Sequence, residues 1–215
     1  MDIRIKSSCG QSFGARQVSK AYIKSNNSKQ CLELFSLDKS DLEFGKHFLK
    51  TFDLKKLYPN EKSYDGFKEW DFYIRNAISK IGDYNVVLAS KNKRPCGIMA
   101  FFERDRQFNL SYIATWRDLP NKDVAYVGKV LMHHLFSEAN DSELLNISLT
   151  PTPATPRGKS CREFYSSLGF KRSANNCMNL FGANFLQKAK ELEKLFEYEK
   201  LDDQTEIDSK ITFVI

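Results

Sequence analysis

Residues 108–135 have the order of elements that binds an anion. A strand pattern ends at Trp116, a polar loop follows, and an apolar helical pattern begins at Val127. The first N–H groups of a helix have no partner within the helix, and the helix dipole places partial positive charge there. Gly128 falls in this first turn, where the absence of a side chain lets a ligand approach the backbone closely. This order of elements therefore predicts a site for a phosphate or another anion.

Two predicted strands and one helix must position this site. Residues 96–103 are a nearly continuous apolar run, which is typical of a buried strand. Residues 108–116 alternate between apolar and polar side chains, so we expect one face of a half-buried strand to carry Phe108, Leu110, Tyr112, Ala114 and Trp116. The helix that follows has an apolar stripe at helical spacing, formed by Val127, Val130, Leu131 and Leu135.

The rest of the chain consists of further strands and helices with short connections. We expect strands over residues 30–35, 84–89, 144–149, 177–181 and 211–214. We expect a first helix that begins with a capping box formed by Ser40 and Glu43 and ends at Tyr58-Pro59. We expect further helices over residues 64–80, 155–168 and 185–196, of which the one over residues 155–168 stops at Gly169. This mixture predicts one α+β or α/β domain over residues 30–182. Residues 1–29 are polar and are expected to form an N-terminal arm, whereas residues 183–215 add a C-terminal helix and strand packed on the same domain.

The composition agrees with a single folded domain and a basic body. The chain has 215 residues, of which 41% are hydrophobic, enough for one sizeable core. The net charge is +6, and residues 184–210 contain eight acids and five bases, a local charge of −3 that leaves +9 elsewhere. A basic body favours an anionic ligand, either a phosphorylated cofactor or nucleic acid. Scattered surface lysines on a soluble protein account for the charge equally well.

The spacing of the cysteines and the length of the apolar runs indicate whether a metal site, an oxidising compartment or a membrane span is expected. The five cysteines are widely spaced and include no Cys-x-x-Cys pair, and three histidines do not complete a zinc site, so no metal is expected. Cysteines of this kind favour a reducing, cytoplasmic location. The first six residues lack the apolar core of a signal peptide, and no apolar run approaches the roughly 20 residues that span a bilayer. No membrane partner is therefore expected.

Residues 164–170, which read Phe-Tyr-Ser-Ser-Leu-Gly-Phe, resemble the Phe-Tyr-x-x-x-Gly-Phe signature near the end of the Gcn5-related N-acetyltransferase (GNAT) superfamily. The expected order of elements is also similar to that family's: a strand, two helices, three strands, the cofactor helix, a strand, a helix and a final strand. The resemblance covers about residues 30–182. It implies a three-layer fold with a central mixed, mostly antiparallel sheet flanked by helices. It also implies transfer of an acetyl group from acetyl-CoA to an amine.

The acyl-CoA loop of this family reads Gln/Arg-x-x-Gly-x-Gly/Ala, and the resemblance aligns Gly128 with its second glycine. Asp123 then replaces the Gln or Arg, and Tyr126 replaces the first glycine. The acid would repel a pyrophosphate, and the tyrosine would narrow the approach unless its φ is negative and its ring turns outward. Lys122 or Lys129 could supply the missing charge. By the family pattern, the residues that bind acetyl-CoA are Ile113, Ala114, Thr115, Tyr126, Val127, Gly128, Lys129 and Val130. The pattern also implies that the strand opens over residues 112–115, so that backbone groups of residues 113–115 pair with the pantetheine arm.

The implied reaction is attack of an amine on a thioester carbonyl, which needs a base for the amine and an acid for the leaving thiolate. The family pattern makes Tyr165 the acid, and the alternative is an aromatic side chain that packs at the end of a helix. Glu103 and Asp105 are the candidate bases, acting directly or through water. Acidic residues at the end of a hairpin are commonly solvated surface groups, so the alternative is that Glu103 and Asp105 have no catalytic role.

Two histidines and a cysteine near the predicted site are explained without a catalytic role. His133 and His134 point in neighbouring directions on the helix, and His134 falls on the apolar stripe, which predicts a core histidine. Cys161 lies one turn before Tyr165 without a His or Asn motif to activate it, so a nucleophilic thiol is not expected. Gly158 and Cys161 stand where the family favours Asn and Ala.

Three functions remain open. The first is acetylation of an amine on a small molecule or a protein. The second is acetylation of aminoacyl-tRNA, as toxins of the same superfamily perform, which the basic body allows although no aromatic-interleaved basic stripe demands it. The third is a non-catalytic CoA-binding or interaction module, favoured by Asp123 and Tyr126. The sequence does not specify the acceptor, the base, or the choice between a monomer and a homodimer.

Overall fold

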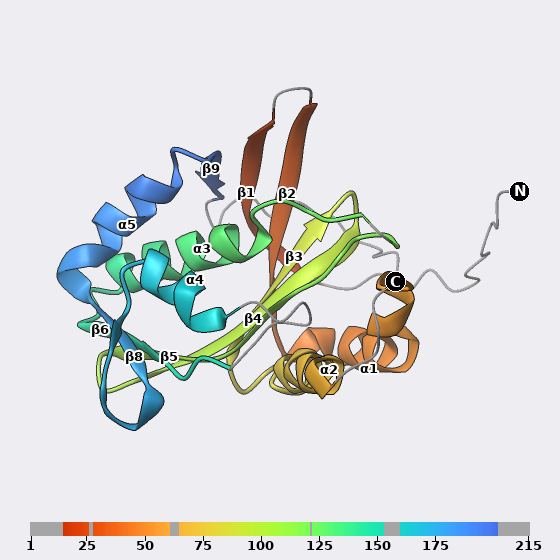
Figure 1. Ribbon diagram of the computed structural model, residues 1–215, viewed down its shortest axis with the longest axis horizontal. Coiled ribbons are helices and arrows are strands. Elements are labelled where there is room, and N and C mark those ends of the chain that lie inside the picture. The colour runs from red at the N-terminus through yellow and green to blue at the C-terminus, as the bar shows by residue number, and fades with distance from the viewer. Residues whose placement is uncertain (1–14, 26–27, 61–64, 121, 153–159, 202–215) are drawn as a thin grey trace, which may run out of the picture.

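The computed structural model of the protein describes residues 15–25, 28–60, 65–120, 122–152 and 160–201. These residues form one sheet of nine strands in the order β7-β8-β6-β5-β4-β3-β2-β1-β9 (Figure 1). Neighbouring strands are antiparallel except β5 and β6, which are parallel. The strands are β1 (Arg16–Ser25), β2 (Ser28–Leu37), β3 (Asn85–Lys91), β4 (Arg94–Arg104), β5 (Gln107–Thr115), β6 (Asn146–Leu149), β7 (Lys171–Arg172), β8 (Met178–Phe181) and β9 (Phe196–Lys200).

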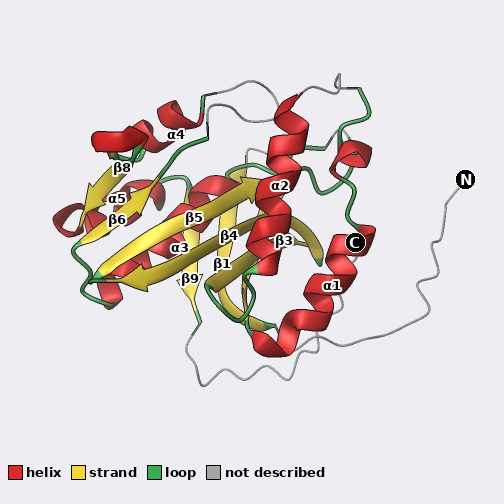
Figure 2. Cartoon of the chain, turned by 90° about the horizontal axis from the view of Figure 1, so that it is seen from below, coloured by secondary structure: helices red, strands yellow, loops and turns green. Residues whose placement is uncertain are grey.

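Helices cover both faces of this sheet (Figure 2). They are α1 (Leu42–Thr51), α2 (Asp65–Ser79), α3 (Val127–Asp141), α4 (Cys161–Ser167) and α5 (Phe185–Leu192). On one face, Trp116 packs against Phe52 just after α1, with ring centroids 5.1 Å apart. On the other face, a Cβ atom on Gly97 would lie 2.6 Å from Cγ1 of Val127, so this glycine lets α3 approach β4 closely. The three layers and the mixed, mostly antiparallel sheet confirm the predicted fold class.

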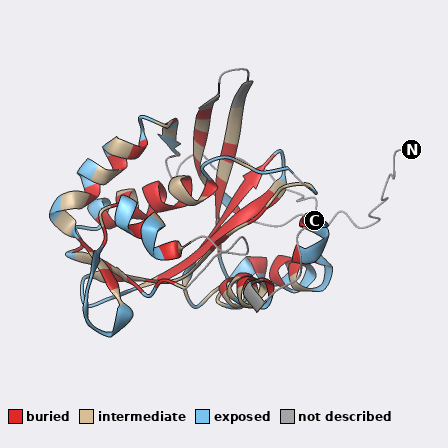
Figure 3. Cartoon of the chain, in the orientation of Figure 1, coloured by how far each residue is buried: buried red, intermediate tan, exposed pale blue. Residues whose placement is uncertain are grey.

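Helix α3 is buried on nearly every side (Figure 3). Its predicted apolar stripe is fully buried, and α5 packs on the helix from outside the sheet. The two histidines contact the C-terminal part of the chain: His133 Nε2 lies 3.1 Å from a carboxylate oxygen of Glu193, and His134 Nδ1 lies 2.9 Å from the hydroxyl of Tyr198. The prediction of a core histidine at position 134 is confirmed, and His133 is a core residue as well.

The two ends of the described chain differ from expectation. Residues 16–25, expected in the N-terminal arm, form β1, which lies between β2 and β9. The helix expected to reach Phe196 ends at Leu192, and Phe196 begins β9 instead. Helix α4 begins at Cys161, with Ser160 accepting a hydrogen bond from the N–H of Glu163. The earlier start expected at residue 155 and the strand expected at 211–214 lie outside the described residues.

Strand β5 carries a bulge that the alternation of its sequence does not reveal. Phe101 of β4 lies opposite Leu110, but the next residue, Ala100, lies opposite Tyr112, so Ser111 is an extra residue in β5. A bulge advances the alternation by one position, and Leu110 and Tyr112 therefore point to opposite faces. The ring of Tyr112 lies 6.2 Å from that of Tyr73 in α2. The prediction that all five alternating residues share one face is wrong, because Tyr112, Ala114 and Trp116, which follow Ser111, point to the opposite face from Phe108 and Leu110.

Candidate active site

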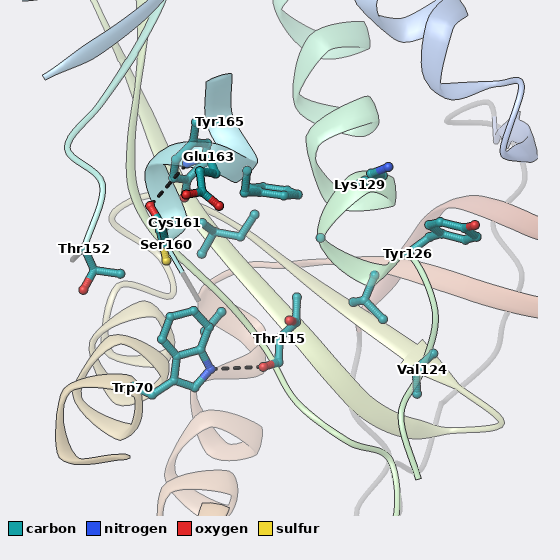
Figure 4. Close-up of a pocket in the computed structure, with 15 residues that line it drawn as sticks. Trp70, Thr115, Val124, Tyr126, Lys129, Thr152, Ser160, Cys161, Glu163 and Tyr165 are labelled. Carbon is teal, nitrogen blue, oxygen red and sulfur yellow. Dashed lines mark hydrogen bonds between the residues drawn. The ribbon is translucent and has the colours of Figure 1, made fainter. Parts of the chain in front are cut away.

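A cavity of about 990 Å³ opens where β5, α3 and α4 meet (Figure 4). Its wall is formed by residues 113–115 of β5, residues 124 and 126–129 at the start of α3, and residues 160, 161 and 163–165 of α4. Trp70 from α2 and Thr152, which follows β6, complete the wall. Tyr126 and Lys129 lie at one end of the cavity, and Trp70 and Cys161 lie at the other. The fold thus brings together the two segments that the sequence assigned to acetyl-CoA and the helix that carries Tyr165.

The edge of β5 that faces the cavity is separated from β6. The two strands pair only between residues 107–110 and 146–149, and residues 112–115 pair with β4 on their other side. The N–H of Trp116 donates to the carbonyl oxygen of Cys96 over 2.9 Å. Because backbone groups alternate in an antiparallel pair, the N–H and C=O groups of Ile113 and Thr115 point away from β4, towards the cavity side. Strand β5 therefore presents hydrogen-bonding groups to an extended ligand, as the resemblance implies for residues 113–115.

Tyr126 takes a backbone conformation that glycine favours. It is the residue before α3 and has φ 60° and ψ 9°, in the left-handed region. Its side chain is 40% exposed, and Lys129 Nζ lies 5.5 Å from the centre of its ring. The ring therefore turns outward, as an open approach requires, but φ is positive and not negative. For a residue with a Cβ atom this conformation costs about 1–2 kcal/mol.

Gly128 lies where the first turn of α3 approaches α4 and β5. A Cβ atom there would lie 3.4 Å from the ring of Phe164 in α4 and 3.8 Å from Cγ2 of Thr115. A larger side chain at this position would therefore project into the space between α3 and α4. The N–H groups of the first turn, including those of Val127 and Gly128, have no partner within the helix.

The charge of Asp123, expected to repel a pyrophosphate, is paired. Its carboxylate lies 3.0 Å from Nε of Arg117, and the Arg117 guanidinium also lies over the ring of Tyr58 at 4.5 Å. This ion pair offsets the negative charge at the start of the loop. Of the two lysines considered for the missing positive charge, Lys129 lines the cavity and Lys122 does not.

Tyr165 is buried in the wall, with 7% of its surface exposed. Its ring packs against Phe164 and Phe170, with centroids 5.2 and 5.8 Å away. Gly169, at φ 91°, ends α4 and lets the N–H of Phe170 donate to the carbonyl oxygen of Tyr165 over 3.1 Å. Burial raises the pKa of Tyr165 well above its ordinary value of 10.0, and Cys161 and Tyr73 raise this pKa further. The phenol is therefore a neutral hydrogen-bond donor.

Cys161 also lines the cavity, but its thiol is not activated. Burial, and secondarily the carboxylate of Glu69, raise the pKa of Cys161 to about 11. A thiol with this pKa is protonated near neutral pH, which agrees with the expectation that it is not a nucleophile.

The candidate bases lie elsewhere. Glu103 is exposed near the far end of β4, six residues from Gly97, a separation of about 20 Å along a strand. Asp105 is exposed in the turn that follows. Neither residue lines the cavity, and the only carboxylate among its described lining residues is Glu163. Val130, expected among the acetyl-CoA residues, is a fully buried residue of α3 and does not line the cavity either.

Trp70 and Thr152 are among the residues of the site that the sequence analysis missed. In the sequence, Trp70 belongs to the apolar face of the helix expected over residues 64–80, yet its indole Nε1 donates to the carbonyl oxygen of Thr115 over 3.0 Å. Thr152 follows β6 in a segment without a recognisable motif.

Among the described residues, no group of three or more His, Cys, Asp or Glu side chains is placed to hold a metal ion. Within the same residues, no helix is long and apolar enough to span a membrane.

Comparisons with known proteins identify similar structures but no similar sequence. No family model matches the chain, and no curated protein matches it. The chain is similar to the PaiA N-acetyltransferase of Thermoplasma acidophilum in complex with coenzyme A, with 16% identity over 70% of this chain and 98% of that one, at a TM-score of 0.47. It is also similar to the ribosomal-protein-S18-alanine N-acetyltransferase of Escherichia coli, with 17% identity over 70% and 93% of the two chains, at a TM-score of 0.45.

Because these TM-scores are below 0.5, we identify the fold from the chain's own topology. Strand β2 is followed by α1 and α2, strands β3 to β5, helix α3, β6, α4 and β8, and β5 separates from β6 beside the start of α3. This is the order, and the open strand pair, that the sequence resemblance implies. The described chain therefore has the fold of the Gcn5-related N-acetyltransferase superfamily.

Proposed function

We propose that this protein is an N-acetyltransferase that transfers the acetyl group of acetyl-CoA to an amine of a small molecule or a protein. The observation that carries this proposal is that one cavity joins the open edge of β5, the first turn of α3 and the buried phenol of Tyr165. These features match three requirements of the reaction. They are backbone partners for an extended chain, donors for phosphates, and a proton donor near the sulfur.

The start of α3 suits the pyrophosphate of acetyl-CoA. The unpartnered N–H groups of its first turn line the cavity, and the missing side chain of Gly128 leaves them accessible. Lys129 adds a positive charge at the same end, and Arg117 offsets the charge of Asp123. The residues present therefore fit the phosphates.

The open edge of β5 suits the pantetheine arm. An extended chain with two amides can pair with the backbone groups of Ile113 and with the N–H of Thr115, in the manner of an added strand. The carbonyl of Thr115 already accepts from Trp70, so Trp70 holds this edge against α2. With the phosphates near Lys129, this path leads the thioester towards Tyr165.

Tyr165 would act on the leaving sulfur. The amine nitrogen forms a bond to the carbonyl carbon of acetyl-CoA, the carbon–sulfur bond breaks, and negative charge develops on sulfur. A neutral phenol can donate a hydrogen bond there, and its raised pKa keeps it protonated until that moment. A positioned acid of this kind contributes roughly 10²–10⁴-fold to the rate.

Ligand binding and turnover test the proposal in two steps. Acetyl-CoA should raise the melting temperature, because a ligand at 100 times its Kd stabilises the folded state by about 2.7 kcal/mol. Release of the CoA thiol is then followed with a panel of acceptors that includes primary amines, a lysine peptide and aminoacyl-tRNA. The absence of any thermal shift at millimolar acetyl-CoA contradicts the proposed cofactor.

A non-catalytic CoA-binding module is the second candidate. It is favoured by the strained Tyr126 at the first glycine position and by the lack of a buried carboxylate among the described lining residues. A thermal shift with acetyl-CoA, combined with no thiol release for any acceptor in the panel, would support this candidate over the enzyme.

A further inference from the structure

A second, much smaller cavity adjoins Tyr165. Its volume is about 20 Å³. A water molecule needs a cavity of about 10–15 Å³ on this kind of measure, so the space suits a single water. The eight residues that line it include Tyr73, Ser111, Ile113, Thr150, Thr152 and Tyr165.

The small cavity is a product of the fork between β5 and β6. Leu110 and Leu149 are the last residues that the two strands pair. The next residue of β5 is the bulged Ser111, and the next of the other segment is Thr150, so the chains part at this point. Both of these residues line the cavity, which therefore lies at the base of the open edge.

Its lining is rich in hydroxyl groups, and one of them lacks a partner. Five of the eight lining residues carry a hydroxyl group. The hydroxyl oxygen of Thr152 is buried and has no hydrogen-bond partner among the described residues. An unsatisfied buried hydroxyl destabilises the folded state, and a water in hydrogen-bond reach would satisfy it.

Three residues line both the small cavity and the large one, namely Ile113, Thr152 and Tyr165. Tyr73 lines the small cavity and is close enough to Tyr165 to influence the charge on its phenol. Tyr165 therefore borders both the proposed thioester site and the hydroxyl-lined space, and the two spaces meet at these three residues.

The proposed reaction leaves the proton of the amine without an obvious receiver. The described lining of the large cavity includes no histidine, and its one carboxylate, Glu163, is in the exposed first turn of α4. Tyr165 alone cannot take the proton, because it is already protonated. Burial, which raises its pKa, also disfavours a lasting tyrosinate after it gives its own proton away.

We propose that the small cavity holds one water, positioned by Thr152 and Ser111, that receives the proton of the attacking amine and returns a proton to Tyr165. This inference rests on the proposed acetyl transfer. As the nitrogen–carbon bond forms and the carbon–sulfur bond breaks, the amine proton moves to the water, a water proton moves to the Tyr165 oxygen, and the Tyr165 proton moves to sulfur. Amine and thioester become amide and thiol, and the water and the phenol are unchanged at the end.

In this scheme Tyr165 is catalytic, and Thr152 and Ser111 are positioning residues. Two substitutions test them: Thr152→Val, which keeps the shape of the side chain and removes the hydroxyl, and Ser111→Ala. Ser148→Ala is the matched control, because Ser148 lies on β6 two residues before Thr150 and lines neither cavity. Acetyl-CoA binding, measured by thermal shift, should be the same in all three variants and in the wild type.

The first measurement needs no acceptor. A crystal structure of the CoA complex at a resolution that shows waters should place one water within hydrogen-bond distance of Thr152 Oγ1 and Tyr165 Oη. The same crystals of T152V should lack it. A cavity without this water in the wild-type complex overturns the proposal.

The second measurement is acetyl transfer to glycinamide and 2-phenylethylamine as amine probes, in mixtures of light and heavy water. T152V should lower kcat by roughly 10- to 100-fold, a part of the full effect of proton transfer. The plot of wild-type rate against deuterium fraction should curve, because several protons move together, and that of T152V should be closer to linear. Wild-type kcat and curvature in both T152V and S111A overturn the relay and leave the proposed acetyl transfer intact. If the protein does not bind acetyl-CoA at all, both the relay and the proposed acetyl transfer are contradicted.

Discussion

The indole nitrogen of Trp70 donates a hydrogen bond to the carbonyl oxygen of Thr115 over 3.0 Å (Figure 4). This bond joins α2 to the edge of β5 at the point where the strand has left β6. Two layers of the fold therefore meet at the proposed path of the pantetheine arm. The position of this edge depends on α2 as well as on the sheet.

Trp70→Phe should weaken acetyl-CoA binding more than it weakens the fold. The variant keeps an aromatic ring and loses one hydrogen bond, worth about 0.5–1.5 kcal/mol in unfolding free energy. The control is Trp116→Phe, since Trp116 Nε1 also donates to a carbonyl, that of Pro95, but does not line the cavity. Urea unfolding and isothermal titration with acetyl-CoA are the measurements. Equal affinities for the two variants would contradict a role for Trp70 at the site.

Gly128→Glu should abolish acetyl-CoA binding and leave the protein folded. The new side chain would place bulk beside Phe164 and a negative charge where the phosphates are proposed. Ser166→Glu, on the exposed side of α4, adds the same charge away from the cavity and serves as the control. We expect the thermal shift with acetyl-CoA to vanish only for G128E. A retained shift would show that the phosphates bind elsewhere.

Tyr126→Val should lower the stability of the fold, whereas Tyr126→Gly should not. Glycine adopts the left-handed conformation freely, whereas a β-branched residue does not, so valine should lower the unfolding free energy by about 1–2 kcal/mol. Glycine should leave it unchanged or raise it by up to about 1 kcal/mol, because relief of strain is partly offset by the entropy of the unfolded chain. Denaturant unfolding gives both values. A glycine variant less stable than the valine variant would rule out strain at this position.

Tyr165→Phe should lower kcat by roughly 10²-fold or more and leave acetyl-CoA affinity near normal. The phenyl ring keeps the packing against Phe164 and Phe170, so the melting temperature should change little. Steady-state acetyl transfer to any acceptor found in the panel is the measurement. An unchanged kcat would return Tyr165 to a packing role. A collapsed melting curve would instead mean that the hydroxyl stabilises α4.

Acid should weaken the fold through His134. Burial lowers the pKa of His134 to about 4, with smaller opposing and supporting effects from Glu138, Lys200 and His133. The unfolded chain, with an ordinary pKa of about 6.5, binds more protons than the folded chain between these values, so stability falls as the pH drops from about 6.5 to about 4. The loss from this group is up to about 3 kcal/mol, and none is expected above pH 7.

His134→Gln removes this titration and keeps a side chain that can bond to the hydroxyl of Tyr198. Urea unfolding at pH 7.5, 6.0 and 5.0 should give a smaller decline for the variant than for the wild type. Parallel declines would assign the acid sensitivity to other groups, such as the buried His133 or the carboxylates.

Local patterns predicted the elements that position the site. The stripe from Val127 to Leu135 and the apolar run of residues 96–103 became α3 and β4, because each pattern matches the period of its element. Gly169 stopped α4 where a left-handed residue was needed. These features depend on neighbours in the sequence, which is why the sequence alone was sufficient.

Features that depend on distant partners were not predicted. The bulge at Ser111 is defined by its register against β4, and the alternation of residues 108–116 continues through it without interruption. Strand β1 is polar in sequence and is held between β2 and β9, so its partners determine its structure. Trp70 reads as a core residue of α2, and only the approach of β5 gives its indole N–H a partner. Even the cap before α1 differs, since Asp38 and Asp41 form the reciprocal bonds predicted for Ser40 and Glu43.

The pairing of β9 with β1 also bears on how the chain reaches this structure. Ser19 lies opposite Lys200, so two segments from nearly opposite ends of the described chain must meet to complete the sheet. Contacts between residues so far apart in sequence form slowly, because a long loop must close before they contribute. During synthesis, β1 can pair with β2 early, but its other edge has no partner strand until β9 has been synthesised. During that interval the unpaired edge of β1 can pair with another nascent copy of the chain. Aggregation during synthesis should therefore depend on how quickly β9 is synthesised and pairs with β1.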